Sequence, residues 1–211
     1  MSPTPWTLSA SGLKIVLDPE SPDFDPGAFT LHDVATHLSR QARYNGAVDW
    51  SVAAHSILAA SLATADNQPR ETIRAVFMHD GHEAYVGDVI SPVRRVVGEP
   101  WQSYEDKFQA AFLRAMGLEA DKSAEVRVYD LLALSCEKQH FFDDRHGYTD
   151  WGGRLPSISP TQREVAWALL SHRVSRETWA QMFYSWGAML GFPTTGRKKV
   201  PIGRREPHQI R

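Results

Sequence analysis

The residues of this sequence whose types could do chemistry lie near its middle, where His79-Asp80 is followed by Glu83 and Asp88. On a helix over this stretch, His79 and Glu83 would stack four residues apart, and Asp80 and Glu83 would share an edge three residues apart. Imidazole nitrogens together with carboxylate oxygens suit divalent ions such as Mn, Co, Ni, Fe, Zn or Mg. Adjacent His and Asp residues are common by chance, however, so this stretch alone does not predict a metal site.

Two residues far from this stretch strengthen the interpretation. His55 lies between Val52 and Ala59 on the apolar side of an expected helix, although a histidine there can also be satisfied by a backbone carbonyl. Asp130 is surrounded at helical spacing by apolar residues. Because a buried, unpaired carboxylate is unfavourable, Asp130 should become neutral, pair with an arginine or bind a cation. Taken alone, Asp130 fits an arginine salt bridge as well as it fits a metal.

The elements that must position these residues are expected to be almost all helices. Short apolar runs broken by proline and glycine predict a small strand or hairpin in residues 12–30. Helical periodicity and stop signals predict helices over residues 30–44, 51–67, 71–85, 101–116, 123–142, 161–174 and 175–190. Asp49 or Ser51 should begin the second of these, and Asp121 or Ser123 the fifth. The predicted fold class is all-α, with a short N-terminal strand or hairpin.

The composition is that of an ordinary globular chain and excludes several classes. The 211 residues carry a net charge of −2, which argues against a nucleic-acid binder. The single cysteine, Cys136, excludes a disulfide framework and a Cys-rich zinc module. No signal peptide or long apolar stretch is seen, so a cytoplasmic protein that does not bind membranes is expected. We expect one domain over residues 1–195 and a basic C-terminal tail over 196–211.

The order of these residues resembles that of the HD-domain metal-dependent phosphohydrolases. The likeness rests on residues 51–56, which contain His55, on the stretch from His79 to Asp88, and on Asp130. Within that superfamily the chain looks most like small bacterial and phage nucleotide phosphohydrolases, which include 5′-deoxynucleotidases and deoxynucleoside-triphosphate hydrolases. The resemblance covers about residues 12–142. Further landmarks in the expected order are Leu38-Ser39-Arg40, Arg43-Tyr44-Asn45-Gly46 and Ser91-Pro92-Val93.

The resemblance implies an HD-domain helical bundle that holds one divalent metal ion. His55, His79, Asp80 and Asp130 would be its protein ligands, and the identity of the metal stays open among the ions named above. Such an ion would lower the pKa of a water toward neutrality and polarise a phosphoryl group.

The resemblance also implies roles for residues around the metal. Glu83 and Asp88 match an acidic pair of the nucleotidases. By their placement, Glu83 would orient or deprotonate the attacking water and Asp88 would protonate the leaving oxygen, although which carboxylate does which stays open. Arg43 matches an arginine directed at the substrate phosphate, whereas Arg94 falls where a lysine often follows the Pro-Val pair. His82 is not restricted by the motif and is either a second proton carrier or an exposed helix residue.

The expected function is therefore divalent-metal-dependent removal of phosphate from nucleotides or deoxynucleotides. The expected partner is a small-molecule nucleotide, and a homodimer stays open. The alternative is a non-catalytic HD-type module that binds a metal or a nucleotide. A metalloprotease is disfavoured, because its His-Glu-x-x-His motif differs from the arrangement of His79, His82 and Glu83.

Overall fold

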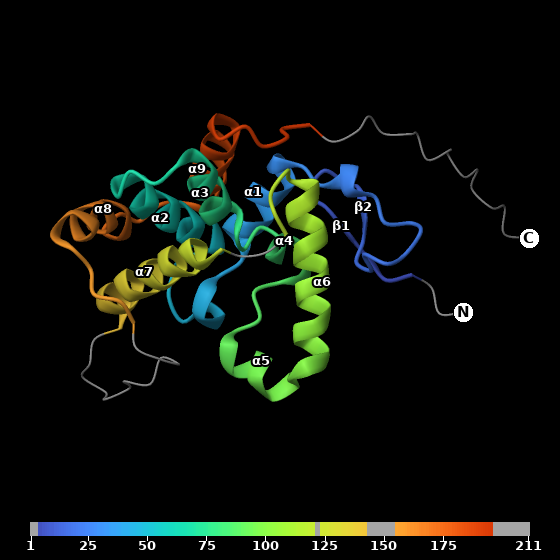
Figure 1. The fold of residues 1–211 in the computed structure, drawn as a ribbon, viewed down its shortest axis with the longest axis horizontal. Helices are drawn as coiled ribbons and strands as arrows, with labels where there is room; N and C mark the ends of the chain where they lie inside the picture. The colour runs from blue at the N-terminus through green and yellow to red at the C-terminus, as the bar shows by residue number, and fades with distance from the viewer. Residues whose placement is uncertain (1–3, 121–122, 143–154, 196–211) are drawn as a thin grey trace, which may run out of the picture.

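The computed structural model describes residues 4–120, 123–142 and 155–195, and this part of the chain is mainly helical, as the sequence predicts (Figure 1). The expected basic tail, Asp121 and much of the segment after residue 142 lie outside the described residues. The helices are α1 (Leu31–Arg40), α2 (Val52–Ala65), α3 (Arg70–Met78), α4 (Glu83–Val86), α5 (Ser91–Val97), α6 (Glu99–Ala115), α7 (Ala124–Phe141), α8 (Pro160–Leu170) and α9 (Arg176–Met189).

A two-stranded antiparallel hairpin precedes the helices. Its strands are β1 (Trp6–Leu8) and β2 (Lys14–Val16). The hairpin prediction is confirmed, but the first strand lies before the expected range of residues 12–30. The turn of the hairpin is fixed to α1, because the backbone N–H and the hydroxyl of Ser11 both donate to the buried carboxylate of Asp33, at 2.7 and 2.9 Å.

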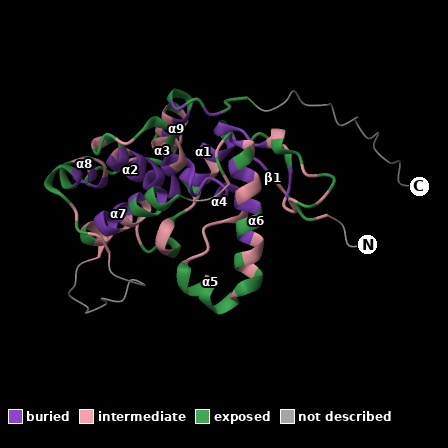
Figure 2. Ribbon diagram, in the orientation of Figure 1, coloured by how far each residue is buried: buried purple, intermediate pink, exposed green. Residues whose placement is uncertain are grey.

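Helix α2 is the centre of the fold. Its sequence is apolar around almost its whole circumference, and a helix of this kind is stable only when neighbours cover every side. Accordingly α2 contacts α1, α3, α7, α8 and α9, and it is buried along most of its length (Figure 2). Of the two caps expected, Asp49 and Ser51, the helix uses Ser51, whose side chain accepts a hydrogen bond from the N–H of Ala54. His55 is thereby fixed inside the protein.

The first predicted helix ends earlier than expected. Helix α1 stops at Arg40, and Ala42 then forms an isolated antiparallel bridge with Ser51. Tyr44 and Asn45 adopt left-handed backbone conformations with φ of 55° and 54°, and a right-handed helix cannot continue through residues in this conformation. The chain therefore turns sharply between α1 and α2 instead of extending α1 to residue 44.

The helix predicted over residues 71–85 is in fact two helices. Helix α3 ends at Met78, a turn occupies residues 79–82, and α4 begins at Glu83. A Cβ atom at Gly81 would lie 2.6 Å from the sulfur of Met78 and 2.7 Å from the ring of Phe112, so the turn is pressed against α6 and only glycine fits there. The expectation that His79 and Glu83 stack on one helix is therefore wrong.

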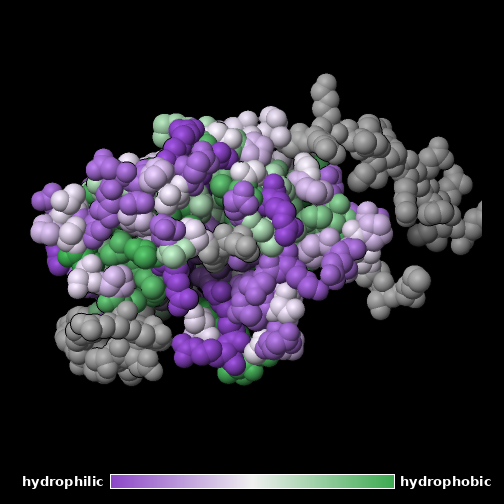
Figure 3. Space-filling model, viewed as in Figure 1, coloured by the Kyte–Doolittle hydropathy of each residue, from purple (hydrophilic) through white to green (hydrophobic). Residues whose placement is uncertain are grey.

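Helix α5 was not expected from the sequence, and it stands beside α6 away from the centre of the bundle (Figure 1). A hollow with largely hydrophilic surroundings lies between α5 and α7 on the face seen in Figure 3. Within the described residues, no helix is both long and apolar enough to cross a membrane.

Candidate metal centre and adjoining pocket

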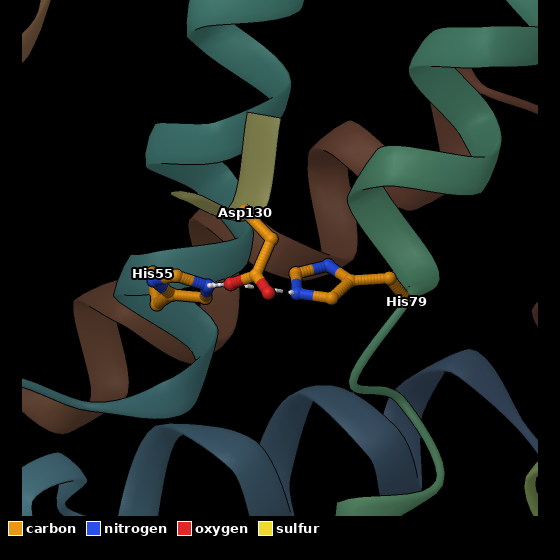
Figure 4. Close-up of side chains that lie close together, drawn as sticks. All are labelled: His55, His79 and Asp130. Carbon is orange, nitrogen blue, oxygen red and sulfur yellow. Dashed lines mark hydrogen bonds and ion pairs between the residues drawn. The ribbon is translucent and has the colours of Figure 1, made fainter. Parts of the chain in front are cut away.

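Three side chains from three separate segments meet beside α2. His55 comes from α2, His79 from the turn after α3, and Asp130 from α7. One oxygen of Asp130 lies 3.1 Å from Nε2 of His55 and 3.6 Å from Nε2 of His79. Figure 4 shows the carboxylate between the two imidazole rings. The structure thus brings together residues that the sequence places 75 positions apart.

Both imidazoles are oriented by hydrogen bonds on their far sides. Nδ1 of His79 donates to the carbonyl of Val76 at 2.7 Å. Nδ1 of His55 lies 2.6 Å from the carboxylate of Glu137, which accepts a hydrogen bond from it. With Nδ1–H used in this way, Nε2 of each ring is the atom presented to Asp130. A histidine ligand must present an unprotonated nitrogen to a metal, so an ion bound here would replace the proton on Nε2 while Nδ1–H keeps its hydrogen bond.

Asp80 lies beside the two histidines. One oxygen of Asp80 lies 3.0 Å from Nε2 of His79 and 3.9 Å from Nε2 of His55. Two ligands at right angles around one divalent ion, each about 2.1 Å from it, would be about 3 Å apart. The distances from Asp80 to the two histidines suit ligands of one ion, but the group whose ligand atoms all lie within 4.8 Å of one another consists of His55, His79 and Asp130 without Asp80.

Two further observations show that the cluster fits a divalent cation. Nε2 of His79 is buried and makes no hydrogen bond of good geometry, although it faces two carboxylates. Burial lowers the pKa of His79, but Asp80 and Asp130 outweigh burial and raise that pKa to about 10. The two carboxylates therefore stabilise a positive charge at this point. A divalent ion bound by two nitrogens and two carboxylates would supply that charge.

The two aspartates beside the histidines, Asp80 and Asp130, line a pocket of about 500 Å³. The residues around it come from the turn after α1, the turn after α3, the segment from α4 to α5, and α7 with the residue that follows it. Its lining combines acidic, basic and apolar side chains: Arg43, Tyr44, Ala47, Asp80, Glu83, Asp88, Ile90, Ser91, Pro92, Arg94, Arg95, Asp130, Leu134 and Phe142. A small molecule in this pocket would lie against Asp80 and Asp130.

Glu83 and Asp88 both line this pocket, as expected from the sequence. Burial raises the pKa of Glu83 well above its usual value, and the charges of Asp80 and Asp88 raise it further. Burial also raises the pKa of Asp88, with Arg43 opposing the shift. Two carboxyl groups with raised pKa values beside a pocket are suited to holding and transferring protons.

Arg43 faces the pocket from the turn after α1. Its Nε donates to Glu137 at 3.2 Å, and its Nη1 lies 3.9 Å from Asp80. Burial lowers the pKa of Arg43, but Glu137, Tyr44, Asp80 and Asp130 raise it above its ordinary value, so the guanidinium stays charged. Arg43 thus places a fixed cation beside the cluster.

Arg94 lines the pocket and also binds neighbouring residues of the protein. Its Nη1 donates to both oxygens of Glu105 at 3.2 Å, its Nε donates to the carbonyl of Val89, and its Nη2 lies 3.8 Å from Glu83. Most of its hydrogen-bonding capacity is therefore directed at neighbouring residues. Its structural effect is to place a positive charge next to Glu83.

A second group of potential ligands consists of His82, Glu83 and Glu105. The guanidinium of Arg94 lies between the two carboxylates of this group and already supplies a positive charge. We therefore assign no second metal ion to it. His82 is buried, with Nε2 3.8 Å from Glu105, so the expectation of an exposed helix residue is wrong.

Sequence reasoning missed Glu137 and Glu105, the two buried carboxylates that support the site. A signal for Glu137 was present, because it follows Asp130 by seven residues and so lies two turns further along the same face of α7. Glu105 lies at helical spacing from Phe108 and Phe112 on the inner face of α6. Buried carboxylates on apolar helix faces require partners, which is the physical argument that singled out Asp130.

Comparison with known proteins identifies relatives but no family. No family model matches the chain. The chain is 31% identical over 111 residues to YfdR, an uncharacterized protein of Escherichia coli strain K12, covering 52% of this chain and 59% of YfdR. It is 33% identical over 129 residues to RCAP_rcc00048, an uncharacterized protein of Rhodobacter capsulatus, covering 58% of this chain and 63% of that protein. The chain thus spans about three fifths of the length of these curated relatives, and their names state no activity.

Proposed function

We propose that this protein is a divalent-metal-dependent phosphohydrolase of the HD-domain type, with residues 1–195 as one domain, which removes phosphate from nucleotides or deoxynucleotides. One observation carries the proposal. Two histidines, each with Nδ1 hydrogen-bonded within the protein, lie against Asp80 and Asp130, and these aspartates line a pocket that also contains two further carboxyl groups and three arginines. The His…His-Asp…Asp order of the sequence, which resembles that of HD-domain phosphohydrolases, supports the same function.

The metal would be held by His55, His79, Asp80 and Asp130. When bound, it would supply a Lewis acid for the phosphoryl group and acidify water at neutral pH. Glu83, buried beside Asp80, would accept the proton of the attacking water. Asp88, further along the pocket, would give a proton to the leaving oxygen.

The arginines of the pocket support an anionic substrate. Arg43 holds its charge beside Asp80 and would contact the phosphate directly. Arg94 is held by Glu105, so we give it mainly the role of orienting Glu83, with a weaker contact to substrate. Arg95 also lines the pocket. Guanidinium groups recognise phosphate oxygens through charge-assisted hydrogen bonds.

The test is phosphate release from a panel of nucleoside and deoxynucleoside mono-, di- and triphosphates. The protein would be freed of metal with a chelator and reloaded with Mn²⁺, Co²⁺ or Mg²⁺. We expect release from at least one class of nucleotide, dependence on the added metal, and loss of release in Asp130→Asn. Asp33→Asn is the matched control, because Asp33 is also a buried carboxylate but holds the N-terminal hairpin, away from the pocket.

The result would also separate the alternative function from the proposal. A protein that binds the metal and a nucleotide but releases no phosphate from any member of the panel would be a non-catalytic binding module. Release that is unaffected by Asp130→Asn would place the activity elsewhere or in a contaminant.

A further inference from the structure

The buried carboxylate of Glu137 connects the candidate metal centre to the wall of the pocket. Glu137 lies on α7, and its side chain is completely buried. It accepts hydrogen bonds from four residues on two sides. Oε1 accepts from Nδ1 of His55 at 2.6 Å and from Nε1 of Trp50 at 2.8 Å, and Oε2 accepts from Nε of Arg43 at 3.2 Å and from the hydroxyl of Tyr44.

The first oxygen of Glu137 orients a metal ligand. Because a carboxylate only accepts hydrogen bonds, Nδ1 of His55 must donate to Glu137, and a metal bound at Nε2 would take the place of the proton that Nε2 directs at Asp130 at 3.1 Å. The indole of Trp50 donates to the same oxygen and restricts its position. An outer carboxylate of this kind fixes the ring orientation of a histidine ligand and increases its basicity.

The second oxygen holds two residues of the pocket wall. Arg43 and Tyr44 both line the pocket, and both donate to Oε2. They lie in the turn where Tyr44 has a φ of 55°, a conformation that is unfavourable for a bulky residue. A strained backbone persists only where surrounding contacts hold it, and Glu137 provides two such contacts.

We propose that Glu137 is a positioning residue that fixes the metal ligand His55 and the pocket residues Arg43 and Tyr44 together, so that removing its charge weakens the binding of the metal and of phosphate at the same time. The metal part rests on the geometry of the cluster. The phosphate part rests on the proposed function, in which Arg43 contacts the phosphate group.

The test uses Glu137→Gln, which keeps the size of the side chain but replaces one acceptor oxygen with an amide donor. Metal binding would be measured by titrating the metal-free protein with Co²⁺. Phosphate binding would be measured with inorganic phosphate on the Co²⁺-saturated protein. We expect Co²⁺ affinity to fall roughly 10–100-fold, as for other outer partners of metal ligands, and phosphate affinity to fall roughly tenfold, as for a charged hydrogen bond.

Two comparison variants separate positioning from general loosening. Asp33→Asn removes the charge of another fully buried carboxylate, and it should leave both affinities unchanged in the folded protein. Tyr44→Phe removes one donor to Oε2 and keeps the charge of Glu137, so phosphate affinity should fall while Co²⁺ affinity does not. The proposal is overturned if Glu137→Gln changes neither affinity, or if Tyr44→Phe or Asp33→Asn weakens Co²⁺ binding as much as Glu137→Gln does.

A measurement on the unmodified protein decides the metal part if Glu137→Gln does not fold. In the Zn²⁺-loaded protein, nitrogen NMR of the imidazoles should show His55 protonated at Nδ1, with slow exchange of that proton, and coordinated through Nε2. Coordination through Nδ1, or a rapidly exchanging Nδ1 proton, would contradict the proposal. None of these measurements needs turnover, so a failure of the proposed hydrolysis would be seen separately.

Discussion

At the scale of single residues, the candidate metal centre is defined by ring nitrogens and carboxylate oxygens that face one another. Each histidine of the candidate metal centre uses Nδ1 for a hydrogen bond within the protein and directs Nε2 toward carboxylates. Glu83 lies next to this cluster, and its pKa is raised by burial and by the charges of Asp80 and Asp88. Ligands and proton carriers can therefore be distinguished by experiment.

Glu83→Gln should lower the hydrolysis rate roughly 10²–10⁴-fold while the metal stays bound, because an amide cannot accept the proton of water. The measurement is phosphate release together with metal content after gel filtration. Asp33→Asn serves as the control for the loss of a buried carboxylate. If the metal is lost together with the activity, Glu83 is a ligand and the assigned role is wrong.

At the scale of secondary-structure elements, the interruption between α3 and α4 is the feature that sequence periodicity did not predict. The spacing of apolar residues in 71–85 continues through the interruption, so periodicity alone predicts one helix. The close approach of Gly81 to Met78 and Phe112 accompanies the turn, and it depends on α6 lying against this segment. Helix caps depend on interactions over only a few residues, and Ser51 and Ser123, each one of two caps expected from the sequence, begin α2 and α7.

Gly81→Ala should destabilise the protein by about 1–3 kcal/mol, the usual cost of inserting a methyl group into a packed interior. It should also weaken metal binding, because His79 and Asp80 belong to the same turn. The measurements are denaturant unfolding and Co²⁺ titration.

Gly117→Ala is the matched comparison. Gly117 has a φ of 72°, but a Cβ there would meet only the end of Arg74, at 3.9 Å. It should cost stability through backbone strain alone and leave the metal affinity unchanged. Equal metal affinities in the unmodified protein and Gly81→Ala would show that the turn does not position the ligands.

At the scale of the whole molecule, the candidate metal centre joins parts of the chain that have no local connection. Its ligands come from α2, from the turn after α3 and from α7, and the pocket beside it is completed by the segment from α4 to α5 and the turn after α1. A metal held at this junction would cross-link the central helix to its neighbours. Binding should therefore be coupled to the stability of the entire fold.

Removing the metal should lower the melting temperature. At a free metal concentration one hundred times the Kd, binding adds about 2.7 kcal/mol of stability, which corresponds to roughly 5–10 °C for a domain of this size. The measurement is thermal unfolding with Co²⁺ and with a chelator. Asp130→Asn should show a much smaller difference between the two conditions, and an equal difference would mean that the metal stabilises the protein at another site.

The sequence by itself determined the local features of this protein: the mainly helical character, the caps of α2 and α7, and the residue types that could bind a divalent ion. These depend on interactions within a few positions of the chain, which spacing reveals directly. Only the tertiary structure decided that Asp130 lies against His55, that Glu137 holds both His55 and Arg43, and that Arg94 is bound to Glu105. Those contacts depend on how α2, α5, α6 and α7 pack, because two side chains on different helices meet only when the packing brings their faces together.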